Sequence, residues 1–105
     1  MFAQKSLVAS NPGLVTRFLR GFFDSIAFLK ANKEATSRVA ERVLQQSPAL
    51  VRKVYDIQAS MFLDDGHFDP LAVAALKKSY IEMKTLRSEP SDAELFTTQF
   101  LPIKR

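Results

Sequence analysis

The longest stretch with a helical pattern of apolar residues runs from Asn11 to Asn32. At 100° per residue, its apolar positions fall within an arc of about 140° on one side of a helix. Asn11 is a favourable N-cap, Pro12 suits the first helical position, and Asn32 can end the helix. We therefore predict a helix with one wide buried face, against which the rest of the chain packs. That face holds Leu14, Val15, Phe18, Leu19, Phe22, Ile26 and Leu29.

Two further helices are predicted between residues 32 and 63. Asn32 can also cap a second helix over residues 33–46, and Ser47 followed by Pro48 opens a third helix that runs to residue 63. Apolar residues at spacings of three and four indicate one inward face for each helix. The face of the second helix holds Ala35, Val39, Val43 and Leu44, and that of the third holds Leu50, Val51, Val54, Tyr55, Gln58, Met61 and Phe62.

A fourth helix is predicted after a turn at Gly66. Asp69 before Pro70 repeats the cap-and-proline start, and the apolar spacing continues to about Arg87. One stripe of this helix holds Val73, Leu76, Tyr80, Met83 and Arg87.

A capping box predicts a short last helix, because Glu94 follows Ser91 by three residues. This helix ends before Pro102 and presents Leu95, Phe96 and Phe100. No long strand pattern follows residue 10. The predicted fold is therefore all-α, with about five helices.

Residues 1–10 are too short to form a domain. The sequence SLVAS at Ser6 to Ser10 fits the end of a strand whose neighbours are missing. The remaining residues, 11–105, form a helical segment of a single domain that we expect to be incomplete.

Charge gives no sign of a nucleic-acid partner. The net charge of +4 comes from 15 Lys and Arg against 11 Asp and Glu, and the basic residues are scattered along the chain. Several opposite-charge pairs lie four residues apart, which is typical of solvated helix faces. Examples are Glu34 with Arg38, Arg52 with Asp56, and Lys78 with Glu82.

The composition is that of a folded, soluble protein, with 47% hydrophobic and 25% charged residues. The absence of cysteine excludes disulfides and thiolate metal sites but leaves the compartment open. The first residues do not form a signal peptide, and no stretch is apolar and long enough for a membrane span.

Candidate chemistry centres on His67, the one histidine, which is near Asp64, Asp65 and Asp69. No nucleophile motif accompanies it, and the acids lack the ligand spacing of a calcium loop or the soft ligands of a zinc site. We predict a polar turn that ends in an N-cap. The three glycines cannot build a phosphate-binding loop. The sequence thus predicts a non-enzyme without metal or cofactor.

Four phenylalanines, Phe18, Phe22, Phe23 and Phe28, could line a ligand pocket, but aromatic residues at helical spacing are usually core. We interpret Phe18 and Phe22 as core. Membrane-surface binding is disfavoured because the polar faces mix acidic with basic residues.

Several short motifs follow one another along the chain in a distinctive order: Asn11-Pro12, then Leu14-Val15 and Phe18-Leu19-Arg20, then Asn32-Lys33-Glu34-Ala35, and finally Asp65-Gly66-His67-Phe68-Asp69. This order resembles the C-terminal part of solute-binding proteins of ABC importers, of the nitrate, sulfonate and taurine type with relatives that bind thiamine precursors. The resemblance covers most of residues 6 to 101. It implies that SLVAS is the remnant of a strand that crosses between lobes.

The resemblance implies a type II periplasmic-binding-protein fold with two α/β lobes, of which this chain supplies C-terminal helices. The implied partners are a small anionic or heterocyclic solute and an ABC permease. The implied location of the parent protein is periplasmic or membrane-anchored outside the cytoplasm. The ligand-contacting segments of such proteins lie mainly upstream, so no solute-binding residue can be assigned to a position in this chain.

Two functions remain open at this point. The first is a C-terminal part of a transport binding protein, with a structural role and without solute binding of its own. The second is an independent small helical interaction module. For the first, an apolar helix face that has lost its packing partner predicts self-association or a molten, dye-binding state.

Overall fold

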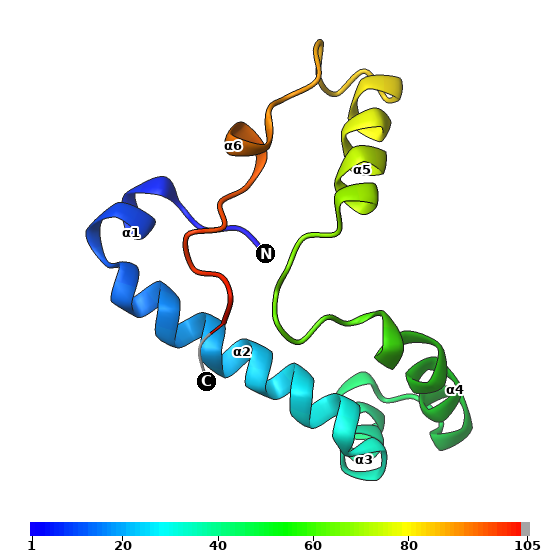
Figure 1. Ribbon diagram of the computed structural model, residues 1–105. Helices are drawn as coiled ribbons and strands as arrows, with labels where there is room; N and C mark the ends of the chain where they lie inside the picture. The colour runs from blue at the N-terminus through cyan, green and yellow to red at the C-terminus, as the bar shows by residue number, and fades with distance from the viewer. Residues whose placement is uncertain (104–105) are drawn as a thin grey trace. The chain divides into compact units, whose positions relative to one another are not determined.

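The computed structural model describes residues 1–103, and within them the chain is entirely helical, with turns and loops between the helices (Figure 1). The six α-helices are α1 (Lys5–Ser10), α2 (Pro12–Ala31), α3 (Lys33–Leu44), α4 (Pro48–Gln58), α5 (Pro70–Glu82) and α6 (Asp92–Leu95). A 3-10 helix, η1, covers Ala59–Met61. The described residues contain no strand, which confirms the predicted all-α fold with about five helices.

The chain divides into two compact units. Met1–Asp65 together with Ile103 form the N-terminal unit, and Gly66–Pro102 form the C-terminal unit. Each unit is described by itself below.

The first residues form α1 where a strand was expected, so that prediction is wrong for this chain. The backbone amides of Leu7 and Val8 both donate to the Gln4 carbonyl at 3.1 Å, and Asn11 N–H donates to Leu7. A strand satisfies its backbone through a neighbouring strand, which the described residues do not supply, whereas a helical turn satisfies it locally. The short helix contacts α2.

The long helix α2 begins and ends where the sequence predicted. The Asn11 side chain accepts a hydrogen bond from Leu14 N–H at 3.1 Å, and Pro12 occupies the first turn. Only part of the predicted apolar face is buried. Val15 and Ile26 are buried, whereas Phe18 is 59% and Phe22 is 42% exposed, so their assignment to the core is wrong. The contacts of α2 with α1, α3 and η1 cover one side of the arc and leave the other side uncovered.

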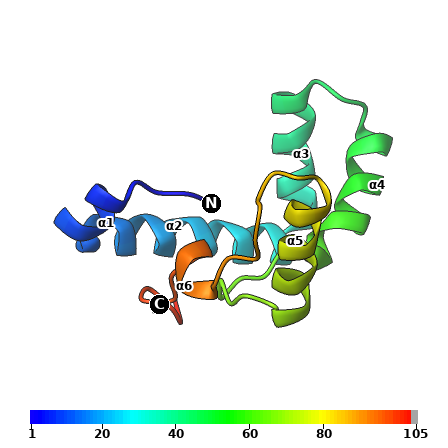
Figure 2. The ribbon, with the colours of Figure 1, turned by 90° about the horizontal axis from the view of Figure 1, so that it is seen from above.

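Helices α3 and α4 lie side by side (Figure 2). Ser37 of α3 and Val51 of α4 are buried at this packing, whereas the predicted inward residues Val39, Val43 and Leu44 are exposed. The actual inward side of α3 consists of smaller and polar side chains, and the ion pairs described below lie beside it.

Three predicted helix ends also need correction. The third predicted helix is interrupted, since α4 ends at Gln58 and η1 follows. α5 ends at Glu82 and not near Arg87, because Lys84 takes a left-handed backbone with φ of 57°. The last helix, α6, stops at Leu95.

The start signals of the C-terminal unit are confirmed. Gly66 has a φ of 76°, and the Asp69 carboxylate accepts from Leu71 N–H at 2.8 Å as the N-cap of α5. The capping box of α6 forms between Ser91 and Glu94. No described side chain of this unit is buried, although Val73, Lys77 and Tyr80 are half-buried.

Candidate functional site

The most elaborate set of polar contacts lies where α2 ends against α4. Carbonyl groups in the last turn of a helix have no partner within the helix and need one from elsewhere. The Tyr55 hydroxyl of α4 lies 2.8 Å from the Leu29 carbonyl oxygen and 3.0 Å from that of Lys30. Asn32 donates to the Phe28 carbonyl at 2.9 Å. The side chains that follow α2 thus terminate it and tie it to α4.

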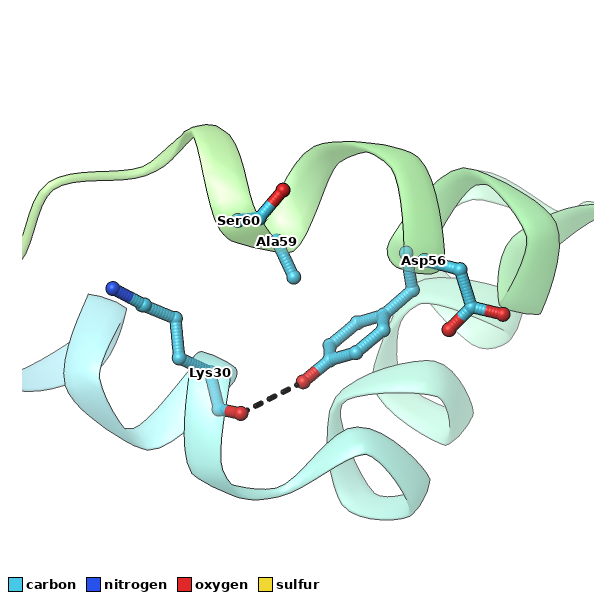
Figure 3. A pocket seen from close by; sticks show the side chains of 5 residues that line it. Lys30, Asp56, Ala59 and Ser60 are labelled. Atoms are coloured by element: carbon cyan, nitrogen blue, oxygen red, sulfur yellow. Dashed lines mark hydrogen bonds between the residues drawn. The ribbon is translucent and has the colours of Figure 1, made fainter.

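A pocket of about 270 Å³ opens beside this contact (Figure 3). Its lining residues are Lys30, Tyr55, Asp56, Ala59 and Ser60. Figure 3 shows the Lys30 side chain and the Asp56 carboxylate at opposite ends of the pocket. Ligand pockets are usually larger, at roughly 300–1,000 Å³, and enclose most of the ligand. The lining residues offer a cation, a carboxylate, the hydroxyl groups of Tyr55 and Ser60, and an aromatic ring.

Ion pairs join α3 to α4 next to the pocket. Lys33 lies 2.5 Å from Asp56, and its ammonium group lies 5.8 Å from the centre of the Tyr55 ring. Arg52 contacts Glu34 at 3.0 Å and Glu41 at 3.2 Å.

These partners differ from the predicted ones. Arg52 and Asp56 each pair across to α3 and not with each other, while the predicted pair of Lys78 with Glu82 is present at 3.7 Å. Packing of two helices brings opposite charges together at sequence separations that a single-helix rule does not consider.

The Arg52 hydrogen bond, followed by its positive charge, lowers the pKa of Glu34 below its usual value. The same pair raises the pKa of Arg52. Both groups are largely solvated, so this cluster orients the two helices and contributes little to stability.

Some of the residues considered for metal or catalytic chemistry have structural roles instead. Asp69 caps α5, as predicted, and Gly66 makes the turn. Within residues 1–103, no group of three or more His, Asp or Glu side chains is arranged to hold a metal ion. Asp64, Asp65 and His67 each take part in other interactions.

The sequence reasoning missed two side chains at the centre of the N-terminal unit. Tyr55 was assigned to an apolar stripe, although a tyrosine in such a stripe normally needs a partner for its hydroxyl group, which was an available signal. Ser37 is fully buried, and its hydroxyl oxygen has no hydrogen-bond partner. Nothing in the local pattern distinguishes Ser37 from an exposed serine.

No family model, curated protein or solved structure matches the chain. Across the part of the chain that the structure describes, no helix is both long and apolar enough to span a membrane.

Proposed function

We propose that the chain is the C-terminal helical part of a solute-binding protein of an ABC importer, of the nitrate, sulfonate, taurine or thiamine-precursor type. In this proposal its role is structural and non-catalytic, and the solute and the permease are partners of the larger protein. Two features support it: the order of short motifs along the sequence, and the large amount of apolar surface that the helices leave uncovered.

The uncovered apolar surface is the observation that carries the proposal. Val15, Ile26 and Val51 are the buried hydrophobic residues of the described chain, while exposed large hydrophobic residues occur on all the longer helices. Helices with one apolar face are stable when another layer covers that face. In the proposed parent protein, an α/β lobe supplies this layer.

The same proposal predicts that the chain alone does not form a solute site. A small solute needs several converging polar groups in a concavity that excludes water. The pocket beside Tyr55 is small and open to solvent, so it does not exclude water. The chain alone is therefore expected not to bind nitrate, sulfonates, taurine or pyrimidine precursors.

An independent helical interaction module is the second candidate, because uncovered apolar faces also suit a protein partner. The two candidates differ in what encodes the missing layer. In the first, it belongs to the same polypeptide, and in the second, to another one.

The test is to translate the DNA upstream of Met1 in the same reading frame and to produce the extended protein. We expect the extension to encode repeated strand and helix patterns, and the extended protein to bind one of the named solutes in calorimetry, with the 105-residue chain as the non-binding control. A hydrophobic-dye assay should give a strong signal for the short chain and a weak one for the extended protein. An upstream region that does not continue the frame, or micromolar solute binding by a dye-negative short chain, would contradict the proposal.

A further inference from the structure

One side of α2 carries a seam of exposed residues with a heptad spacing. The seam consists of Leu14, Phe18, Gly21, Ser25 and Phe28, separated by four, three, four and three residues. This is the spacing at which two helices interlock side chains along a shared line. Leu14 is 43% exposed and Phe28 is 56% exposed. A side chain added at Gly21 would meet no atom within 4 Å, so the middle of the seam is open.

The seam combines large side chains with a shallow hollow, which Gly21 and Ser25 form in its middle. Gly21 has no side chain, and the Ser25 hydroxyl donates to the Gly21 carbonyl at 2.8 Å. Ser25 could therefore be covered without leaving its hydroxyl donor unpaired. Phe18 lies one turn before the hollow and stacks on Phe22, with 6.3 Å between ring centroids.

We propose that the seam binds the same seam of a second copy of this chain in an antiparallel orientation. In this register Phe18 of each copy lies over Gly21 of the other, and Leu14 lies over Ser25 of the other. Large residues thus meet small ones throughout the centre of the contact, as close packing requires. A parallel pair would instead place Phe18 against Phe18 and leave a void between the two glycines.

Charge selects the same register. Arg17 and Asp24 lie on one flank of the seam, one residue before Phe18 and Ser25, where residues of paired helices form interhelical ion pairs. The antiparallel register brings Arg17 of each copy toward Asp24 of the other, twice by symmetry. A shift by one heptad would bring the two Asp24 carboxylates together. Asp24 also has contacts within its own chain, and a carboxylate can accept from more than one donor.

The available area indicates a weak dimer. Leu14, Phe18, Phe22 and Phe28 are 43%, 59%, 42% and 56% exposed. Phe22 is counted because it lies beside the seam and stacks on Phe18. With about 200 Å² for a large apolar residue, these exposed fractions leave roughly 400 Å² of apolar surface on each copy and roughly 800 Å² for the pair. Stable interfaces bury about 1,200–2,000 Å², so we expect a dissociation constant in the micromolar range or weaker.

Two glycines of the same helix provide a matched test by sedimentation of the full chain from about 1 µM to about 1 mM. Gly21→Gln fills the hollow and should weaken dimerisation at least tenfold. Gly13→Gln lies off the seam and should weaken dimerisation far less than Gly21→Gln, because the nearest atom there is the end of the flexible Arg17 side chain at 3.6 Å, which can move aside and still reach Asp24. Glutamine favours a helix more than glycine does, so circular dichroism should show that both variants stay helical.

Charge reversal tests the register. Arg17→Glu alone and Asp24→Arg alone should each weaken the dimer several-fold, and the double variant should restore it. The chain has no native cysteine, which allows a second test. A mixture of Leu14→Cys and Ser25→Cys chains should form disulfides between them, while each variant alone should not, because identical positions lie about 16 Å apart along antiparallel helices.

Three results would overturn the proposal: a chain that is monomeric over the whole range, equal effects of the two glycine substitutions, or cross-linking of each cysteine variant with itself. The pairing is proposed for the 105-residue chain by itself, since the α/β lobe of the proposed parent protein would cover the same side of α2. A monomeric chain would leave the solute-binding proposal standing, and failure to find a solute would leave the dimer standing.

Discussion

The two units of the chain hold their helices in different ways. Within residues 1–103, the four buried side chains, Val15, Ile26, Ser37 and Val51, all lie in the N-terminal unit. Its helices are also joined by polar contacts between residues as far as 26 apart in sequence. The helices of the C-terminal unit are held by their N-caps and by contacts, two of which join residues that are 15 and 28 apart in sequence. Lys77 lies 2.5 Å from Asp92, and the rings of Phe68 and Phe96 stack with centroids 4.1 Å apart.

This difference separates two sources of order. Capping depends on side chains within a few residues of the helix end and forms with or without a core. Burial depends on a second element arriving from elsewhere in the chain. The C-terminal unit has few such contacts, and we expect its helices to open with a smaller free energy than α2 to α4.

The largest expected effect separates the two sides of α2. Ile26→Ala should lower the free energy of unfolding by about 2–4 kcal/mol, because it removes a buried side chain that the surroundings cannot replace. Phe22→Ala should cost only about 1 kcal/mol, because the ring is partly exposed already. Urea unfolding followed by circular dichroism measures both. A larger loss for Phe22→Ala would mean that the uncovered side of α2 is the true core.

The Tyr55 contact provides the next test of the N-terminal unit. Tyr55→Phe keeps the ring and removes the hydroxyl group from the two carbonyl groups at the end of α2, which should cost about 1–2 kcal/mol. Tyr80→Phe in α5 is the control and should change stability by less. Equal losses would show that the contact between α2 and α4 adds nothing specific.

In the C-terminal unit, Ser91→Ala removes the capping box and should cost about 1 kcal/mol of local stability. Amide exchange should quicken at Glu94 and Leu95 and stay unchanged in α2 to α4. Faster exchange in α2 to α4 as well would contradict an effect confined to the C-terminal unit.

Ser37→Ala should have an effect of opposite sign. The serine hydroxyl is buried without a partner, so its removal should leave stability unchanged or raise it by up to about 1 kcal/mol. Thermal unfolding should be compared with that of Ser79→Ala. The hydroxyl of Ser79 is exposed and donates to the Ala75 carbonyl, so it serves as the control. A clear loss for Ser37→Ala would show that the hydroxyl has a partner after all.

The smallest expected effect is the pH dependence of stability that arises from two carboxylates, Glu34 and Glu94. The pKa of Glu34 is lowered by the Arg52 hydrogen bond, and the pKa of Glu94 is lowered by the Ser91 backbone amide. Their stabilisation is complete above the usual value of 4.5 and is lost as pH falls through the lower folded values. Glu34→Gln should reduce the acid sensitivity of the N-terminal unit alone, which amide exchange at two pH values can resolve. Unchanged acid sensitivity would show that the Arg52 contact is not formed in solution.

The sequence by itself determined where α2, α4, α5 and α6 begin, whereas α1 was not predicted and Asn32 makes no side-chain cap bond at the start of α3. Asn11, Ser47, Asp69 and Ser91 all cap helices as predicted, because each cap uses a side chain and a backbone amide only two or three residues apart. The all-α class follows from the same local signals. The candidate site was less predictable, since the pocket residues come from the end of one helix and from two later elements.

Tertiary structure decided which apolar residues are buried. An arc of α2 is apolar over its whole width, yet only the side that meets α1, α3 and η1 is covered, and Phe18 lies outside that contact. Likewise, Arg52 pairs with α3 because helix packing places Glu34 and Glu41 nearer than Asp56. Periodicity states which side of a helix can be buried, while the elements that arrive against it determine how much of that side is buried.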